Sequence, residues 1–344
     1  MSVKALIRPL YFFVQRIYRR SNLVLGKQIL FFLKLNSRLI LGYSPGMKFD
    51  GLGAQLQRVL AVNALAQYWG VTSTHPPIEK IAIHPLDGLE TRDSYDDFLN
   101  NVNRLIDAQS QFKFCVRAIY INDLDFKSLI RVIKYLLSSE GKVHLTVTHP
   151  YYFVDANPRI YNCKSNMLIS EKLLNYSTES LKDSIVLHHR HGVGKMAIQP
   201  GQKSPREIEV DKITDVVLQC IARNSNANIM LHIFTDAPAH DLQFHPPSDQ
   251  IDSWTNLPGF DGQVMNINAG ALESLTNRTS IPLKIHRGGN PLISLANLST
   301  AGTLILSRSS FGYVAAVLGK TQNVWAPRDF WHPLLDGWDS YIAK

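Results

Sequence analysis

The stretch SIVLHHRHGVGK, residues 184–195, decides the fold prediction. Its apolar run ends abruptly in imidazole and guanidinium groups, which are followed by two glycines. This pattern predicts a buried parallel strand whose carboxyl end opens into a ligand crevice. Because side chains alternate along a strand, His188 and Arg190 share one face, and His189 and His191 share the other. The chemical unit at the strand tip is therefore His-x-Arg.

Arg190 is the candidate anion ligand at this tip. Its planar donors suit a bidentate contact to a phosphate, worth about 1.5–3 kcal/mol for a charged hydrogen bond. A solvated basic loop and a zinc site are the alternatives. Zinc is disfavoured because no Cys or carboxylate follows at ligand spacing, and histidines on alternate faces cannot converge on one ion.

The composition fits a globular protein with two cores: 344 residues, 45% hydrophobic and 19% charged. The net charge of +8 comes from residues 1–49, which hold nine Lys or Arg and no Asp or Glu. The remainder has 27 of the 36 basic residues and all 28 acidic ones, net −1, so we expect no nucleic-acid partner. Cys115, Cys163 and Cys220 lack metal or redox spacing, which favours a cytoplasmic protein with reduced thiols.

Residues 1–45 have the pattern of a basic amphipathic segment. One helical face over residues 4–20 gathers Leu6, Leu10, Phe13, Val14 and Ile17, and basic residues lie on the other side. The following apolar stretch, Leu23 to Leu41, is interrupted by three basic residues and lacks the about 20 apolar residues of a spanning helix. Basic residues also break every candidate signal-peptide core. We expect residues 1–45 to lie on an anionic membrane surface, peripheral on its inner face. Packing on the protein body or on a partner chain is the alternative.

A glycine-containing turn follows at Asp50-Gly51-Leu52-Gly53-Ala54-Gln55 and opens a helix that is predicted to run through Trp69. Glycines at a strand-to-helix turn let the backbone approach a ligand and point N–H groups at it. A dinucleotide fingerprint is not met, because Leu56 occupies the position of its third glycine. A purely structural tight turn is the alternative.

Strand-like and helical patterns alternate in two stretches, which predicts two doubly wound, Rossmann-like α/β halves with parallel sheets. The first stretch contains Ile81–His84, Tyr95–Ala108, Val116–Ile121, Phe126–Ser139 and Val143–Thr148; the second contains the strand from Ser184, then Arg206–Arg223, Asn228–Thr235, Leu283–His286, Pro291–Thr300, Thr303–Ser307 and Ser310–Leu318. Residues 149–180 are predicted to connect the domains, and 238–279 to form surface loops with a weak helix. The predicted division is a segment 1–45 and domains 46–175 and 176–344.

Asp236 and the stretch 309–311 are also predicted to line the crevice of Arg190. Asp236 follows a strand and could accept from a base or ribose hydroxyl, with a turn-capping role as the alternative. Ser309, Ser310 and Phe311 open a helix after the next apolar strand, where hydroxyls and backbone N–H groups would meet an anion. A plain helix cap is compatible with that role.

Taken together, three of these stretches resemble fucosyltransferase-like glycosyltransferases of the GT-B fold, which use GDP-sugars. Residues 50–55 resemble the family's Gly-Gly-Leu-Gly-Asn-Gln, residues 188–193 resemble His-x-Arg-Arg-Gly-Asp, and residues 309–312 resemble Ser-Ser-Phe-Ser. The order and spacing of all three, over residues 50–319, carry the resemblance. This sequence departs from the patterns at Ala54, His191 and Val193.

The resemblance implies fucosyl transfer from GDP-fucose to a glycan acceptor, with the donor held mainly by the second domain. Arg190, Ser309 and Ser310 would bind the diphosphate, and His188 would seat the nucleotide. The donor-binding set is completed by Gly51, Gly53, Gln55, Asp236 and Phe311. No metal or other cofactor is expected, because Arg190 and a helix N-terminus can stabilise the leaving GDP. The variant Arg190→Ala is expected to lose donor affinity and turnover while its thermal unfolding curve stays nearly unchanged.

Two alternatives are also compatible with the sequence. The same scaffold could use another nucleotide sugar, and a protein that has lost turnover could bind a glycan or nucleotide. The general base is not assigned among His286, Asp261 and Asp50, since no spacing singles one out.

Overall fold

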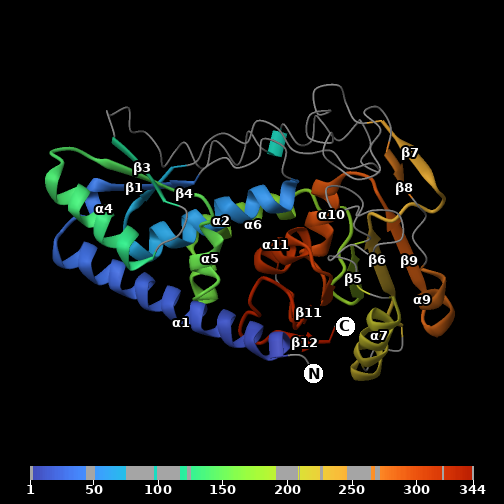
Figure 1. The fold of residues 1–344 in the computed structure, drawn as a ribbon. Coiled ribbons are helices and arrows are strands. Elements are labelled where there is room, and N and C mark those ends of the chain that lie inside the picture. The colour runs from blue at the N-terminus through green and yellow to red at the C-terminus, as the bar shows by residue number, and fades with distance from the viewer. Residues whose placement is uncertain are drawn as a thin grey trace. The chain divides into compact units, whose positions relative to one another are not determined.

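The computed structural model describes residues 3–43, 51–74, 97–98, 117–121, 125–190, 208, 210–224, 228–245, 265–267, 272–319 and 321–342 (Figure 1). The chain divides into two compact units. The first comprises Met1–Lys48, Gln55–Glu79 and Leu99–Leu168; the second comprises Phe49–Ala54, Lys80–Phe98 and Ile169–Lys344. Each unit contains its own parallel sheet, which confirms the prediction of two Rossmann-like α/β halves.

The sheet of the first unit has four parallel strands in the order β2-β1-β4-β3. They are β1 Leu39–Tyr43, β2 Thr72–Ser73, β3 Arg117–Ile121 and β4 Val143–Val147. Parallel neighbours need long crossovers, and α2 (Leu52–Trp69) and α4 (Phe126–Ser138) provide two of them. Both helices match their predicted spans within a residue or two. At the start of α4, the Asp125 carboxylate accepts from Ser128 N at 2.6 Å, and this bond lowers the pKa of Asp125.

The N-terminal segment is a longer helix than predicted and is not separate from the first unit. Helix α1 runs over Val3–Phe32 and leads through a short 3-10 helix at Asn36–Arg38 into β1. Treating residues up to 45 as a surface segment was wrong for β1, because all five of its residues are buried and it pairs with both β2 and β4. No helix among the described residues has the length and apolar character needed to cross a membrane.

The second half of α1 packs on the first unit. Its buried positions are Asn22, Leu23, Gly26 and Leu30, spaced as one helical face. The Trp69 indole donates to the Leu23 carbonyl at 3.0 Å, and a Cβ at Gly26 would come 3.0 Å from the same ring. This part of the segment therefore follows the alternative interpretation, a helix packed on the protein body.

Residues 149–180 carry more structure than the predicted connection. They contain α5 (Tyr151–Val154), a 3-10 helix (Pro158–Tyr161) and α6 (Lys164–Leu174). The division between the two units falls at Leu168/Ile169, inside α6, rather than at the predicted 175/176. Short helices with mixed burial leave little periodic signal in the sequence, which explains why they were missed.

The sheet of the second unit has six parallel strands in the order β9-β6-β5-β10-β11-β12. They are β5 Ile185–His189, β6 Leu231–Thr235, β9 Leu283–Arg287, β10 Thr303–Leu306, β11 Asn323–Pro327 and β12 Asp339–Tyr341. Numbered along the chain, the order is 3-2-1-4-5-6, that of a doubly wound nucleotide-binding fold. The first four strands were predicted; β11 and β12 were not.

Helices cover the two faces of this sheet separately (Figure 1). One face packs under α7 (Val210–Arg223) and α9 (Glu273–Arg278) in an apolar core with Ile185, Leu187, Ile233 and Ile305. Helices α10 (Pro291–Leu298) and α11 (Ser310–Leu318) belong to the other side. A small antiparallel pair, β7 (Leu242–Phe244) and β8 (Met265–Ile267), lies where surface loops were predicted. The predicted strand Ile81–His84 lies outside the described residues, as does most of the predicted helix Tyr95–Ala108.

Candidate functional site

The candidate site lies at the switch point of the second sheet, where β5 and β10 are neighbours. From this pair the chain order proceeds to β6 and β9 on one side and to β11 and β12 on the other. In doubly wound sheets ligands bind in the crevice outside the carboxyl ends of such strands. Here those ends carry Arg190, directly after β5, and the Ser307–Ser310 turn, directly after β10.

Arg190 is held by Asp236, which follows the neighbouring strand β6. Arg190 Nη1 lies 3.0 Å from Asp236 Oδ2, and the two side chains are only 14% and 15% exposed. The guanidinium fork has five donors, so a carboxylate at Nη1 and a phosphate can bind the same side chain. Asp236 thus orients Arg190; its predicted contact with a base or ribose stays a prediction.

This ion pair changes the expectation for stability. Removing one member of a buried pair leaves the other charge uncompensated, which is destabilising. The idea that Arg190 is dispensable for folding is therefore not supported by its nearly buried position beside Asp236.

His188 is packed into the wall of the crevice rather than presented at its surface. Its Nδ1 lies 3.2 Å from Ser307 Oγ, and its ring lies 5.5 Å from the Phe311 ring. Burial, aided by the positive charge of Arg190, lowers the pKa of His188 to about 3, while Asp236 opposes the shift. The ring is neutral at pH 7, so it can position groups by packing and hydrogen bonding, without an imidazolium charge.

His189 points to the opposite face of β5, as the alternation predicted. Its Nδ1 lies 2.9 Å from Thr235 Oγ1, and that hydroxyl also accepts from Ala237 N at 3.0 Å. His188 and His189 therefore do not converge. His191 and Val193 lie outside the described residues.

The Ser309–Phe311 turn begins α11 as predicted. Ser309 is the N-cap residue and its hydroxyl accepts from Phe311 N at 3.2 Å. Ser310 Oγ lies 3.4 Å from His332 Nε2. The N-terminus of a nine-residue helix thus faces the carboxyl end of the sheet, where its dipole and N–H groups favour an anion.

The glycine stretch of residues 51–53, which ends in the first two residues of α2, meets the start of α11 directly. A Cβ built on Gly53 would lie 2.5 Å from Phe311 Cα and 2.6 Å from Phe311 N, so any larger residue would force one of the two backbones to shift. Gly312 is under a similar constraint, because its Cβ would come 2.9 Å from His188 Nδ1. The three separate sequence motifs therefore converge within the second unit. Gly51 precedes α2 in the glycine stretch, whereas Gln55 belongs to the first unit.

Sequence reasoning missed His332, which is buried beside the helix start. The Trp331 indole donates to His332 Nε2 at 2.8 Å, and the Tyr313 ring lies 4.5 Å from the His332 ring. An indole can only donate, so His332 Nε2 is the acceptor in this hydrogen bond. The available signal was an apolar strand that ends in polar residues, the same pattern that identified Arg190.

His286, one of the candidate bases, does not lie beside Arg190. It projects from β9 toward His232 on β6, with Nε2 3.0 Å from His232 Nδ1, and its ring stacks on Phe234 at 4.2 Å. Burial lowers the pKa of both histidines, and the Lys284 charge adds to the effect. Asp50 and Asp261, the other candidates, lie outside the described residues.

Comparison with known proteins gives structural neighbours but no sequence family. No family model matches the sequence, and no curated protein is significantly similar. The fold is similar to POFUT1 in complex with GDP, with 11% identity, a TM-score of 0.41, and 89% of this chain and 99% of that chain covered. It is similar to the glycosyl transferase family 9 protein from Veillonella parvula DSM 2008 at 12% identity and a TM-score of 0.38, covering 90% and 86%.

A third neighbour is E. coli ADP-heptose lps heptosyltransferase II, at 10% identity and a TM-score of 0.34, covering 88% of this chain and 89% of that chain. Likeness at this level carries no argument about substrate. The observations that bear on function are therefore the sheet order and the site at the ends of β5 and β10.

Proposed function

We propose that this protein is a glycosyltransferase that takes its sugar from a nucleoside-diphosphate donor bound in the second unit. The observation that carries the proposal is Arg190, fixed by Asp236 at the tip of β5, next to the N-terminus of α11 after β10. A cation and a helix N-terminus on adjacent strands at a switch point form a site for a diphosphate.

The chemistry is the displacement of a nucleoside diphosphate. An acceptor hydroxyl oxygen bonds to the anomeric carbon of the sugar, the bond from that carbon to the β-phosphate oxygen breaks, and the hydroxyl proton passes to a base. Negative charge develops on the leaving diphosphate, where Arg190 and the backbone N–H groups at Ser310 lower the barrier. His188, which is neutral, packs behind Phe311 and supports the floor of the site.

GDP-fucose is the proposed donor and a glycan the proposed acceptor. The support is the order and spacing of the three motifs that resemble fucosyltransferase-like enzymes, two of which meet at Gly53 and Phe311. Another nucleotide sugar, or binding without turnover, is the competing possibility.

A donor panel tests these proposals. Purified protein is incubated with GDP-fucose, GDP-mannose, UDP-, CMP- and ADP-sugars, and nucleotide release is measured with and without candidate glycans. We expect release from GDP-fucose above all others. Release from a different donor would correct the sugar assignment, and binding of a nucleotide without release from any donor would favour the non-catalytic alternative.

We also propose that the outer face of α1 docks on an anionic membrane. Val14, Ile17, Val24 and Phe31 are spaced along one helical face, and they are 55%, 51%, 37% and 73% exposed. Arg16, Arg20 and Lys27 are exposed beside this stripe. Each such cation near an anionic surface contributes on the order of 1 kcal/mol, and the apolar stripe can insert between headgroups.

Cosedimentation with vesicles of phosphatidylcholine, with and without phosphatidylserine, tests the docking. The variant Val14→Asn/Ile17→Asn/Phe31→Asn should lose binding to the anionic vesicles. Ile342→Asn, which removes another well exposed apolar side chain, is the matched control and should bind like the wild type. Equal pelleting of all three proteins, or equal binding to neutral vesicles, would rule out the proposed surface.

A further inference from the structure

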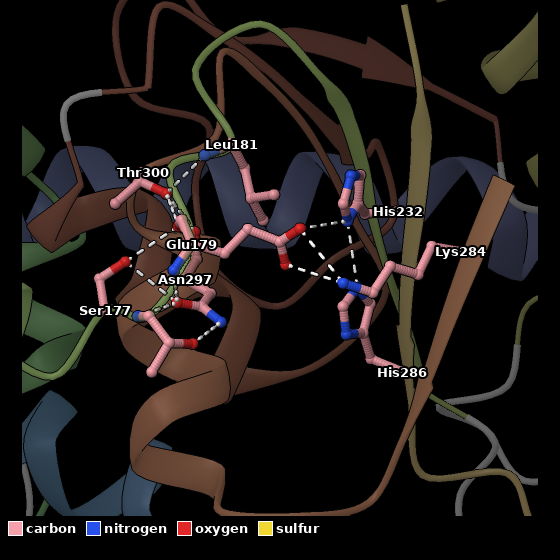
Figure 2. A network of polar contacts seen from close by, with 9 residues as sticks. Ser177, Glu179, Leu181, His232, Lys284, His286, Asn297 and Thr300 are labelled. Atoms are coloured by element: carbon pink, nitrogen blue, oxygen red, sulfur yellow. Dashed lines mark hydrogen bonds and ion pairs between the residues drawn. The ribbon is translucent and has the colours of Figure 1, made fainter. Parts of the chain in front are cut away.

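A second group of side chains capable of chemistry lies on the second unit, apart from Arg190. Glu179, in the loop before β5, faces His232 on β6 and His286 on β9 (Figure 2). One ligand atom from each lies within 4.8 Å of the others. Residues His188, Phe234 and His286 are in register across β5, β6 and β9, so about two strand spacings, or ~10 Å, separate the backbones of His286 and His188.

The spacing of the three ligand atoms is close to that of a metal site. His232 Nδ1 lies 3.0 Å from His286 Nε2 and 3.9 Å from Glu179 Oε1. Ligands about 2.0–2.2 Å from a tetrahedral zinc ion are about 3.3–3.6 Å apart. These two pairs therefore need shifts of a few tenths of an ångström, and the third pair, which lies within 4.8 Å, needs at most about 1.5 Å. Two imidazoles and one carboxylate are a donor set that suits zinc.

The loop that presents Glu179 is fixed in place by Asn297 of α10 and by Thr300, which follows that helix. The buried Asn297 accepts through Oδ1 from Ser177 Oγ at 3.0 Å and from Thr178 N at 3.0 Å. Thr300 Oγ1 accepts from Leu181 N at 3.1 Å, on the other side of the glutamate (Figure 2). The backbone on both sides of Glu179 is therefore held in place, which fixes the point from which its carboxylate extends.

We propose that Glu179, His232 and His286 bind one zinc-type divalent cation, with a water at the fourth position. The ion would join the loop before β5 to β6 and to β9, which is the edge strand of the sheet. In the metal-free protein, the hydrogen bond between His232 Nδ1 and His286 Nε2 requires a proton on one of these two nitrogens. On binding, that ring adopts its other neutral tautomer, so both nitrogens offer lone pairs and no proton has to leave.

Lys284 is the natural competitor for this site. Its Nζ lies 3.2 Å and 3.4 Å from the two oxygens of Glu179, and its side chain is 53% exposed. The ammonium can swing into solvent when a dication enters, but it opposes binding by charge repulsion. Removing the Lys284 charge should therefore strengthen zinc binding. If Glu179 and Lys284 form only a structural ion pair, the same change should lower stability and leave zinc affinity unchanged.

Zinc titration of the full chain tests the proposal. Binding is monitored by calorimetry, and the metal content is measured after dialysis. We expect one zinc per chain and a rise in melting temperature with zinc. Glu179→Gln and His286→Ala should each weaken binding by more than the about 10–100-fold seen when only a supporting hydrogen bond to a ligand is lost. Lys284→Met should bind zinc more tightly than the wild type, and His240→Ala, at an exposed histidine outside the cluster, should bind as the wild type does.

Three outcomes would overturn the proposal. One is unchanged zinc affinity in Glu179→Gln, a variant that keeps the size of the side chain and so preserves the fold. Another is the absence of stoichiometric zinc in both the wild type and Lys284→Met. The third is a Lys284→Met protein that loses stability without gaining zinc affinity, which would make the cluster an ion pair only. All readouts are independent of sugar transfer.

Discussion

Replacing Gly53 by alanine perturbs the contact between the glycine stretch of residues 51–53 and the start of α11. The added Cβ would stand 2.5 Å from Phe311 Cα and 2.6 Å from Phe311 N, both backbone atoms that cannot rotate away. Ordinary carbon contacts are about 3.5–4.0 Å long, so the start of α11 or the glycine stretch must move by roughly 1 Å. Overpacking of this kind costs about 1–3 kcal/mol.

The consequence should appear in both stability and donor binding. Because Phe311 follows Ser309 and Ser310, a shift of the helix start also displaces the groups that are proposed to hold the diphosphate. We expect a free energy of unfolding lower by about 1–3 kcal/mol in urea titrations, together with weaker GDP binding by calorimetry.

Gly141→Ala is the matched control for this experiment. A Cβ at Gly141 meets nothing within 4 Å, so the same chemical change should leave both quantities at their wild-type values. If Gly53→Ala matches Gly141→Ala in stability and in GDP affinity, the close contact between the glycine stretch and α11 is not what brings the motifs together.

Three further predictions concern the site. Asp236→Asn should lower the free energy of unfolding by about 2–3 kcal/mol, less than for a fully buried pair because both side chains are about 15% exposed. Arg190→Gln/Asp236→Asn should recover part of this loss in urea titrations, and full additivity of the two substitutions would show that the pair is not coupled. Sugar transfer should survive EDTA, since a cation and a helix N-terminus neutralise the diphosphate, and activity lost to EDTA and restored by magnesium or manganese would contradict this. The pKa of His188 falls from 6.5 to about 3 on folding, so its contribution to stability is fully present above pH 6.5 and is lost, by up to about 1.4 kcal/mol per pH unit, as pH falls toward 3. Between about pH 7.5 and about pH 5, urea titrations should therefore show a smaller loss of stability in His188→Gln than in the wild type.

Sequence alone was most informative where a pattern depends on near neighbours. The apolar run before His188 is fully buried in β5, and Ser309 caps α11 as its position after an apolar strand predicted. Both features follow from local rules, namely alternation along a strand and the preference for hydroxyls at helix starts.

Sequence was least informative where strand order and register decide which side chains meet. The contact of Arg190 with Asp236 depends on β5 and β6 being adjacent with His189 opposite Thr235. The cluster around His232 depends in the same way on the pairing of β6 with β9. For α1, periodicity identified an amphipathic helix, but the packing of Trp69 against Leu23 and Gly26 could not be read from the helix itself.

Calorimetric binding of GDP and of guanosine to the wild type and to Arg190→Gln/Asp236→Asn tests whether Arg190 holds the diphosphate. The double variant removes the guanidinium without leaving a buried unpaired charge. We predict that the wild type binds GDP more tightly than guanosine. The variant should lose about 10- to 150-fold of the GDP affinity, the value of one charged hydrogen bond, and a smaller factor of the guanosine affinity, since Asp236 is also predicted to contact the base or ribose. Equal GDP affinity in the two proteins, or a wild type that does not distinguish GDP from guanosine, would contradict a diphosphate site at Arg190.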